Sequence, residues 1–121
     1  EVLDKNTLDA LEGAAWVTVL PVADRIAVQL LRDELDAGES EAIILACEAD
    51  ADLLLLDERA ARRKAKILNL SMIGTLGILL MAKREGLIAS LKPLLDELLH
   101  VGFRMSDELY QQVCETADEK V

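Results

Sequence analysis

The sequence predicts an α/β domain with a parallel sheet flanked by helices and a helical C-terminal cap. Three observations support this fold class. Helix-like and strand-like patterns alternate between residues 39 and 73. The strand-like runs are short and almost wholly apolar, which is typical of parallel strands covered on both faces. The connection 57–70 is also long enough to hold a right-handed crossover helix.

The predicted elements follow one another without an internal repeat or a low-complexity linker. Helices are expected over residues 4–12, 23–35, 39–49, 58–68, 74–85, 90–100 and 106–117, and strands over 16–20, 53–56 and 71–73. We expect Asn6 or Thr7 to lie near the cap of the first helix and Ser106 to cap the last one. Gly86 and Gly102 are the expected helix stops.

Composition bounds the chain to one domain spanning residues 1–121. Hydrophobic residues make up 52% of its 121 residues, and they are mostly aliphatic. Trp16, Phe103 and Tyr110 are the only aromatic residues. This scarcity argues against a surface on which successive bases stack, as in single-strand binding proteins.

The charge is unevenly distributed along the chain. The formal net charge is −10, which argues against a general affinity for nucleic acids. Residues 59–104, however, hold 9 bases and 3 acids, a net of +6. This basic stretch indicates either a phosphate-binding face or a solvated helix face paired with nearby acids.

The two cysteines predict a reduced, cytoplasmic protein. Cys47 lies in an apolar helical run and is expected in the core, and no CxxC motif is present. With His100 as the only histidine, no zinc-ligand cluster is formed. The longest uncharged run, 67–82, is too short and too often interrupted to span a membrane.

Glu39 is the first candidate site residue. Residues 36–38 are expected to break the chain before the helix that Glu39 opens. Helical spacing places Glu39 on one stripe with Ile43 and Ala46, whereas Glu41 and Glu48 are expected to face solvent. An acid on the core side indicates either a bound divalent cation or a favourable position at the positive end of the helix dipole.

Asp57 is the second candidate. It directly follows four leucines, at the carboxyl end of the predicted strand 53–56. Ligands of open α/β sheets bind at this edge, and carboxylate oxygens suit Mg²⁺. The alternative is that Asp57 caps the helix that follows, and the two roles do not exclude each other.

Basic residues follow Asp57 at once. Arg59, Arg63 and Lys66 fall on one stripe of the predicted helix 58–68, where they could hold a phosphate backbone. A surface helix with ion pairs would show the same pattern. Thr75 follows the strand 71–73, and its hydroxyl is expected to bind a phosphate or a metal-bound water, or to cap its own helix.

Five segments taken together resemble a known family. They are GESEAI at 38–43, LLDERAAR at 55–62, IGTLGIL at 73–79, AKREGLI at 82–88 and GFRMS at 102–106. In this order they resemble the PIN-domain-like proteins of the DUF3368 family, relatives of the toxin ribonucleases of toxin–antitoxin systems. The resemblance covers roughly residues 15–116.

The resemblance implies a ribonuclease that depends on Mg²⁺ or Mn²⁺. In this family type, three or four carboxylates at one sheet edge bind the metals that activate a water. Glu39 matches the helix acid and Asp57 the late-strand acid. It also implies RNA as substrate, an antitoxin protein as partner and a three-layer PIN-like sheet.

The chain departs from the family pattern at its start. The family begins with a strand that ends in Asp, followed by a helix bearing Glu, and residues 1–13 do not provide them. We therefore expect an N-terminally incomplete domain with weak or no nuclease activity. The exposed sheet edge favours homo-oligomerisation, and the alternative function is a non-catalytic binding or oligomerisation module.

A phosphoacceptor receiver domain is a third interpretation. It shares an Asp at one strand end and a Thr at the next. It fits less well, because no acidic pair follows an early strand and the interval from Asp57 to Thr75 is short.

Overall fold

The computed structural model of the protein describes residues 4–120. The chain divides into two compact units, Glu1–Met72 and Ile73–Val121, and each has its own apolar core. The sequence pattern did not indicate this division. The assignment of residues 1–121 to one domain remains a prediction.

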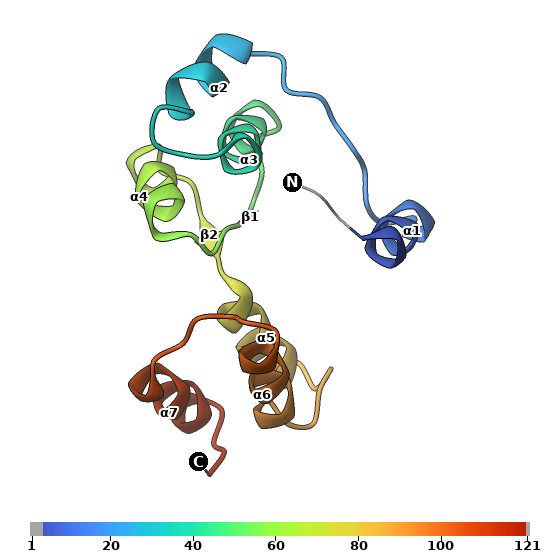
Figure 1. Cartoon of the computed structure of the whole chain (residues 1–121), viewed down its shortest axis with the longest axis vertical. Helices are drawn as coiled ribbons and strands as arrows, with labels where there is room; N and C mark the ends of the chain where they lie inside the picture. Colours follow the sequence, from blue (N-terminus) through green and yellow to red (C-terminus); the bar gives the residue numbers. More distant parts are fainter. Residues whose placement is uncertain (1–3, 121) are drawn as a thin grey trace. The chain divides into compact units, whose positions relative to one another are not determined.

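The first unit is mainly helical with a small sheet (Figure 1). Its elements are α1 (Lys5–Gly13), α2 (Arg25–Leu31), α3 (Ala37–Glu48), β1 (Leu54–Leu55), α4 (Arg59–Ile67) and β2 (Met72–Ile73), with the division of the chain falling within β2. The two strands form a two-stranded parallel sheet. The backbone N–H of Leu54 donates to the carbonyl of Ser71 at 2.9 Å. Helix α3 contacts α2, α4 and β1.

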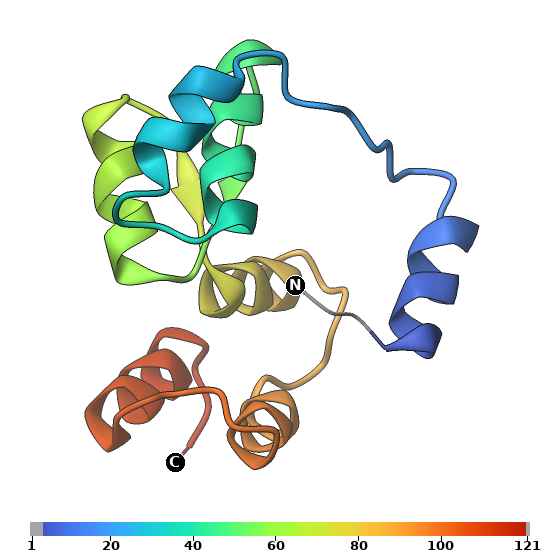
Figure 2. The same ribbon diagram turned by 45° about the horizontal axis from the view of Figure 1, so that its top comes forward.

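The predicted strand 16–20 is wrong. These residues run as an extended connection between α1 and α2 (Figure 2). Trp16 is 87% and Val19 91% exposed. Strand propensity acts through pairing and burial, and no described strand pairs with this segment. Helix α1 forms as expected, with Asp4 as its N-cap, whose side chain accepts from the N–H of Thr7.

Helix α3 begins at Ala37, inside the segment that was expected to break the chain. The cause is a capping box between Asp36 and Glu39. The backbone N–H of Glu39 donates to Oδ1 of Asp36 at 2.8 Å, and the Glu39 carboxylate accepts from the Asp36 N–H at 3.4 Å. These bonds satisfy donors that the first helical turn would leave unpaired, so Gly38 is held inside the helix.

The core of the first unit packs α3, α4 and β1 together. Its buried members are Leu35, Ile43, Ala46, Leu54, Leu56, Ala61 and Ala65. Along the strand run, Leu54 and Leu56 are buried, whereas Leu53 and Leu55 are 44% and 61% exposed. The expectation of strands covered on both faces is therefore wrong for this run. Only one set of alternating side chains is packed against helices.

Two acids on α3 hold α2 in place rather than facing solvent alone. The two carboxylate oxygens of Glu48 accept from the backbone N–H groups of Ala23 and Asp24, at 2.9 and 2.7 Å. Glu41 pairs with Arg25 at 2.8 Å. Cys47 is exposed, against the prediction that it lies in the core. It lies in the last turn of α3, where residues 47–49 are all exposed.

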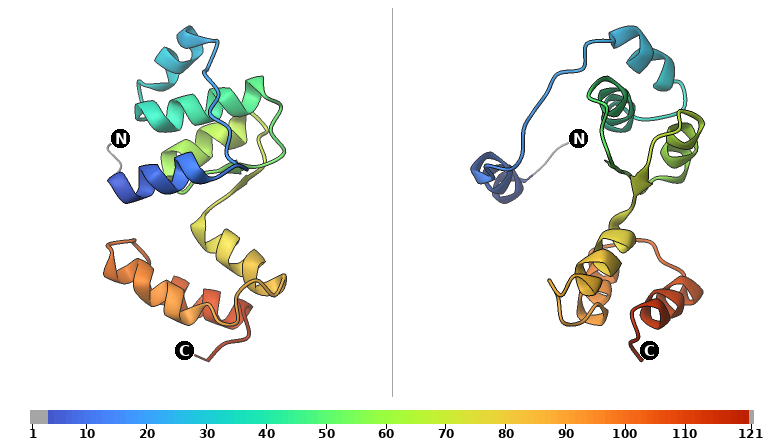
Figure 3. Two further views of the ribbon diagram at one scale, coloured as in Figure 1. Left: turned by 90° about the vertical axis from the view of Figure 1, so that its right-hand side faces the viewer. Right: turned by 180° about the vertical axis from the view of Figure 1, so that it is seen from behind.

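The second unit consists of three helices, α5 (Thr75–Arg84), α6 (Lys92–His100) and α7 (Asp107–Thr116), seen from two further sides in Figure 3. The predicted stops are confirmed. Gly86 and Gly102 adopt φ of 77° and 96°, a region that glycine enters without steric cost. Ser106 is confirmed as the cap of α7, since its hydroxyl accepts from the N–H of Leu109 at 3.1 Å.

The core of this unit is formed by Leu91, the N-cap of α6, and Leu95 of α6 with Val113 and Cys114 of α7. At its margin the hydroxyl of Tyr110 donates to a carboxylate oxygen of Asp96 at 2.7 Å. This bond, together with partial burial, raises the pKa of Tyr110 to about 12. A polar contact thus fastens α7 to α6 beside the apolar one.

Glu119 joins three parts of the second unit. Its carboxylate accepts from Nζ of Lys83 at 2.7 Å, from the hydroxyl of Ser90 at 2.7 Å, and from the N–H groups of Leu91 and Lys92 at 2.7 and 3.1 Å. The Lys83 bond and then the Leu91 and Ser90 bonds lower the pKa of Glu119 from its ordinary 4.5 to about 2. The segment after α7 is thereby tied to α5 and to the start of α6.

We predict that Glu119→Gln lowers the melting temperature of the second unit at neutral pH. Because the folded pKa lies below the unfolded one, the contribution of Glu119 is fully present above about pH 4.5 and is lost as the pH falls towards 2. Melting curves between pH 7 and 2 should therefore converge for the two proteins at the acid end. Equal melting temperatures at pH 7 would contradict the proposed role.

We also predict that Ser40→Ala stabilises the protein. Ser40 lies on α3 with no exposed surface, and its hydroxyl has no hydrogen-bond partner among the described residues. Removing this hydroxyl and gaining a better helix former should raise the free energy of unfolding by about 1 kcal/mol. Ser106→Ala, which deletes a working cap, should instead lower it by about 1 kcal/mol. Urea unfolding followed by circular dichroism measures both changes.

Candidate functional site

A basic hollow lies where β1 leads into α4. It has a volume of about 390 Å³ and is lined by Asp57, Arg59, Arg62, Arg63, Lys66 and Met72. Four bases and one acid give this lining a net formal charge of +3. In a chain whose net charge is −10, this concentration of positive charge distinguishes the hollow, which we call the α4 hollow.

The spacing of α4 explains how the bases gather there. Arg59, Arg63 and Lys66 are separated by four and three residues, so they share one face of the helix. Ala61 and Ala65 are fully buried on another face, where they pack in the core of the first unit. The small alanines let the helix approach the sheet, and the basic face is left at the surface.

Asp57 lies in the α4 hollow with the predicted basic residues. It is exposed and follows Leu56, which is buried. The expectation that Asp57 is the N-cap of the next helix is wrong, because the N-cap position is taken by Glu58. Helix α4 begins at Arg59, one residue later than predicted.

Arg62 is a residue of the hollow that sequence reasoning did not select. Its guanidinium donates to the carbonyl oxygen of Leu56 at 2.7 Å. That carbonyl belongs to the same planar peptide group as the N–H of Asp57. Arg62 therefore fixes the peptide that leads into Asp57. In sequence it is one more base beside the stripe, and nothing in the pattern marks its backbone partner.

The other two predicted residues are not in this hollow. Glu39 is half-buried in the first turn of α3, where its carboxylate takes part in the capping box with Asp36. Thr75 is the first residue of α5 in the second unit. It lines a small apolar hollow of about 230 Å³ together with Leu79, Leu94 and Leu98. Its predicted contact with RNA stays a prediction.

Comparison with protein families shows which family this chain belongs to. The model of the family DUF3368, described as a PIN domain, matches residues 1–119. The chain belongs to this PIN-domain family. The match reaches further than the segments at 15–116 that suggested it. Comparison with curated proteins and with solved structures gave no match.

PIN domains have a nuclease-like fold and in general bind divalent metals. The mostly helical first unit with its small parallel sheet is consistent with an α/β fold of this kind. Among residues 4–120, the longest helix is α3 with 12 residues, and none has the length and apolar character of a membrane-spanning segment.

The described residues do not fit a complete PIN-type metal centre. No three acidic, histidine or cysteine side chains among them are grouped closely enough to hold an ion. Asp57 offers oxygen ligands of the kind that Mg²⁺ accepts, but four cationic side chains share its hollow. Their charge opposes a divalent cation and favours an anion.

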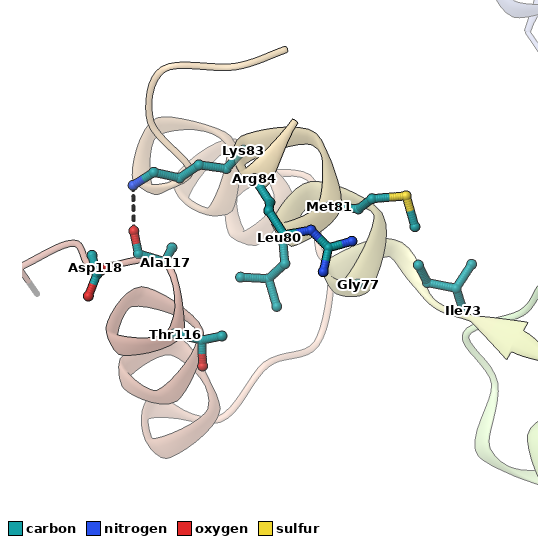
Figure 4. A pocket seen from close by; sticks show the side chains of 9 residues that line it. All are labelled: Ile73, Gly77, Leu80, Met81, Lys83, Arg84, Thr116, Ala117 and Asp118. Atoms are coloured by element: carbon teal, nitrogen blue, oxygen red, sulfur yellow. Dashed lines mark hydrogen bonds between the residues drawn. The ribbon is translucent and has the colours of Figure 1, made fainter. Parts of the chain in front are cut away.

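A second hollow lies in the other unit, between α5 and α7 (Figure 4). It has a volume of about 580 Å³, and Leu80, Met81 and Thr116 are among the side chains that line it. At its margin Nζ of Lys83 donates to the carbonyl oxygen of Ala117 at 2.6 Å. None of the predicted site residues lines it.

We predict that Arg62→Met loosens the junction between β1 and α4. Losing a charge-assisted hydrogen bond should lower the free energy of unfolding by about 1–2 kcal/mol. The amide of Asp57 should also exchange its hydrogen faster, because its peptide group is no longer held. Native-state hydrogen exchange measures this effect.

Arg63→Met is the matched control for this change. It removes the same charge from the same hollow, and Arg63 is exposed. If it speeds exchange at Asp57 as much as Arg62→Met does, the hydrogen bond to Leu56 is not what holds the junction.

Proposed function

We propose that this chain acts on RNA as a PIN domain of the ribonuclease type found in toxin–antitoxin systems. Membership of the PIN-domain family supports a nuclease-type role. The observation that carries the choice of substrate is the α4 hollow. It places an acid that follows a strand among four bases suited to phosphate.

In this proposal Glu39 and Asp57 are the catalytic carboxylates and the ligands of Mg²⁺ or Mn²⁺. Arg59, Arg63, Lys66 and Thr75 contact the RNA. The proposal extends to a cytoplasmic location, an antitoxin partner, self-association and the three-layer sheet of the family. It is supported by the family and by the sequence positions that match its acids.

Hydrolysis by the chain alone should be weak or absent. A two-metal phosphodiesterase clamps both the attacking and the leaving oxygen, which takes more carboxylates than two. Among residues 4–120, no three acidic, histidine or cysteine side chains are close enough together to hold a metal ion. The bases remain able to contact phosphate, since charge attraction does not require the complete ligand set.

A second candidate function is a non-catalytic binding or oligomerisation module. Exposed apolar side chains in the first unit favour it, above all Trp16, Val19 and Leu55, which are 87%, 91% and 61% exposed. Large apolar residues at such exposure often mark a surface that a partner covers. The two functions differ in whether an acid in the α4 hollow affects RNA cleavage.

The test is cleavage of a single-stranded RNA by this chain in the presence of Mn²⁺. We predict slow cleavage at most. Asp57→Asn should lower any such rate at least about a hundredfold, the loss expected when a group that stabilises the transition state is removed.

Asp52→Asn is the control for this substitution, because it removes an exposed acid before β1 and outside the hollow. Unchanged cleavage by Asp57→Asn would rule out the proposed site. Absence of cleavage would favour the binding module.

A further inference from the structure

We infer that the α4 hollow binds a phosphate group of RNA directly, without a divalent metal, and that Asp57 weakens this binding. The inference rests on the proposed function in taking RNA as the ligand. It departs from the metal-centred role of Asp57, because the hollow that holds Asp57 has the charge of an anion site. Binding of RNA at the α4 hollow and cleavage of RNA can therefore be measured as two separate properties.

The first argument is that the lining of the hollow is strongly basic. Four side chains within one segment of eight residues, 59–66, supply a formal charge of +4, and Asp57 reduces that of the whole lining to +3. The remaining base of this segment, Lys64, is not part of the lining and pairs with Glu34 at 3.3 Å. The bases of α4 therefore divide into one that is paired across the surface and four that share the hollow.

The second argument is the preorganisation of Arg62. A guanidinium carries five N–H donors in a rigid fork. One terminal nitrogen of Arg62 is already held by the Leu56 carbonyl at 2.7 Å. This bond fixes the group in the wall of the hollow while donors remain for a ligand. Less side-chain freedom is then lost when a phosphate binds, which strengthens binding.

The third argument concerns the class of anion. The three bases Arg59, Arg63 and Lys66 extend along one face of α4 for about two turns, roughly 10 Å at 1.5 Å per residue. A row of this length suits successive phosphates of an extended backbone better than a single small anion. The nearly complete absence of aromatic side chains in the chain leaves base stacking little part, so we expect weak sequence preference.

Asp57 opposes the ligand that its neighbours attract. Its carboxylate shares the hollow with the bases, so its negative charge repels a phosphate when no metal intervenes. Replacing Asp57 by Asn keeps the shape and removes the charge. Loss of the Asp57 carboxylate should therefore improve the binding of RNA.

The experiment measures binding of a fluorescent oligouridine to the full chain by anisotropy, in EDTA and in Mg²⁺, over a series of salt concentrations. We expect the affinity to be retained in EDTA. Arg63→Gln should lower it and reduce the steepness of its salt dependence by about 0.7, the value for one lost phosphate contact on a single strand. Asp57→Asn should tighten binding in EDTA by about twofold to fivefold.

Lys64→Gln is the matched control, since it removes one positive charge from the same helix outside the hollow. It should leave the salt dependence nearly unchanged. Inorganic phosphate provides a second arm: the row of bases predicts that it competes with the oligonucleotide only weakly. Circular dichroism melting of each variant confirms that it is folded before binding is compared.

Three results would overturn the inference: loss of binding in EDTA, an equal effect of Lys64→Gln and Arg63→Gln, or weaker binding by Asp57→Asn in EDTA. Strong competition by inorganic phosphate would replace the RNA backbone by a single phosphate as ligand.

Cleavage separates this inference from the proposed function. If Asp57→Asn binds RNA more tightly but no chain cleaves it, the inference stands and the nuclease proposal fails. If Mn²⁺-dependent cleavage needs Asp57 but EDTA abolishes binding, the nuclease proposal stands and the inference fails.

Discussion

The junction between β1 and α4 depends on one hydrogen bond, from the Arg62 guanidinium to the Leu56 carbonyl. It satisfies the Leu56 carbonyl directly after β1, where no further strand among residues 4–120 continues the ladder. It also places a fixed positive charge beside Asp57. The buried alanines of α4 pack in the same core as Leu56, so the basic face of the helix and the peptide that follows the strand are held in one arrangement.

The same junction explains why a metal centre and an anion site compete for one position. A carboxylate at the end of a parallel strand is well placed for a cation, and Asp57 is such a group. The helix that follows, however, brings only bases to that place. The acid that sequence spacing paired with it, Glu39, is part of the capping box that starts α3. Glu39 is thus explained by the capping of α3. Asp57 lies among positive charges, which favour an anion over a metal ion.

Sequence patterns predicted the helices well, because their signals are local. Apolar spacing, the cap at Ser106 and the glycines at 86 and 102 act within one or two turns. The strand at 16–20 was wrong, because a strand needs a partner and its apolar composition cannot supply one. Cys47 was misplaced because its neighbours in sequence are apolar, although it lies in the exposed last turn of α3. Arg62 acts through a backbone carbonyl six residues earlier. Glu119 acts through groups 27 to 36 residues earlier. Residue types do not reveal either set of partners.

The two cysteines lie in different units and in opposite environments. Cys47 on α3 is exposed, whereas Cys114 on α7 has no exposed surface. An alkylating reagent should therefore react with Cys47 at once and with Cys114 only after the second unit opens. Cys47 can therefore serve as a site for a fluorescent label in the native chain. The rate at which Cys114 is modified measures how often the helices around it separate.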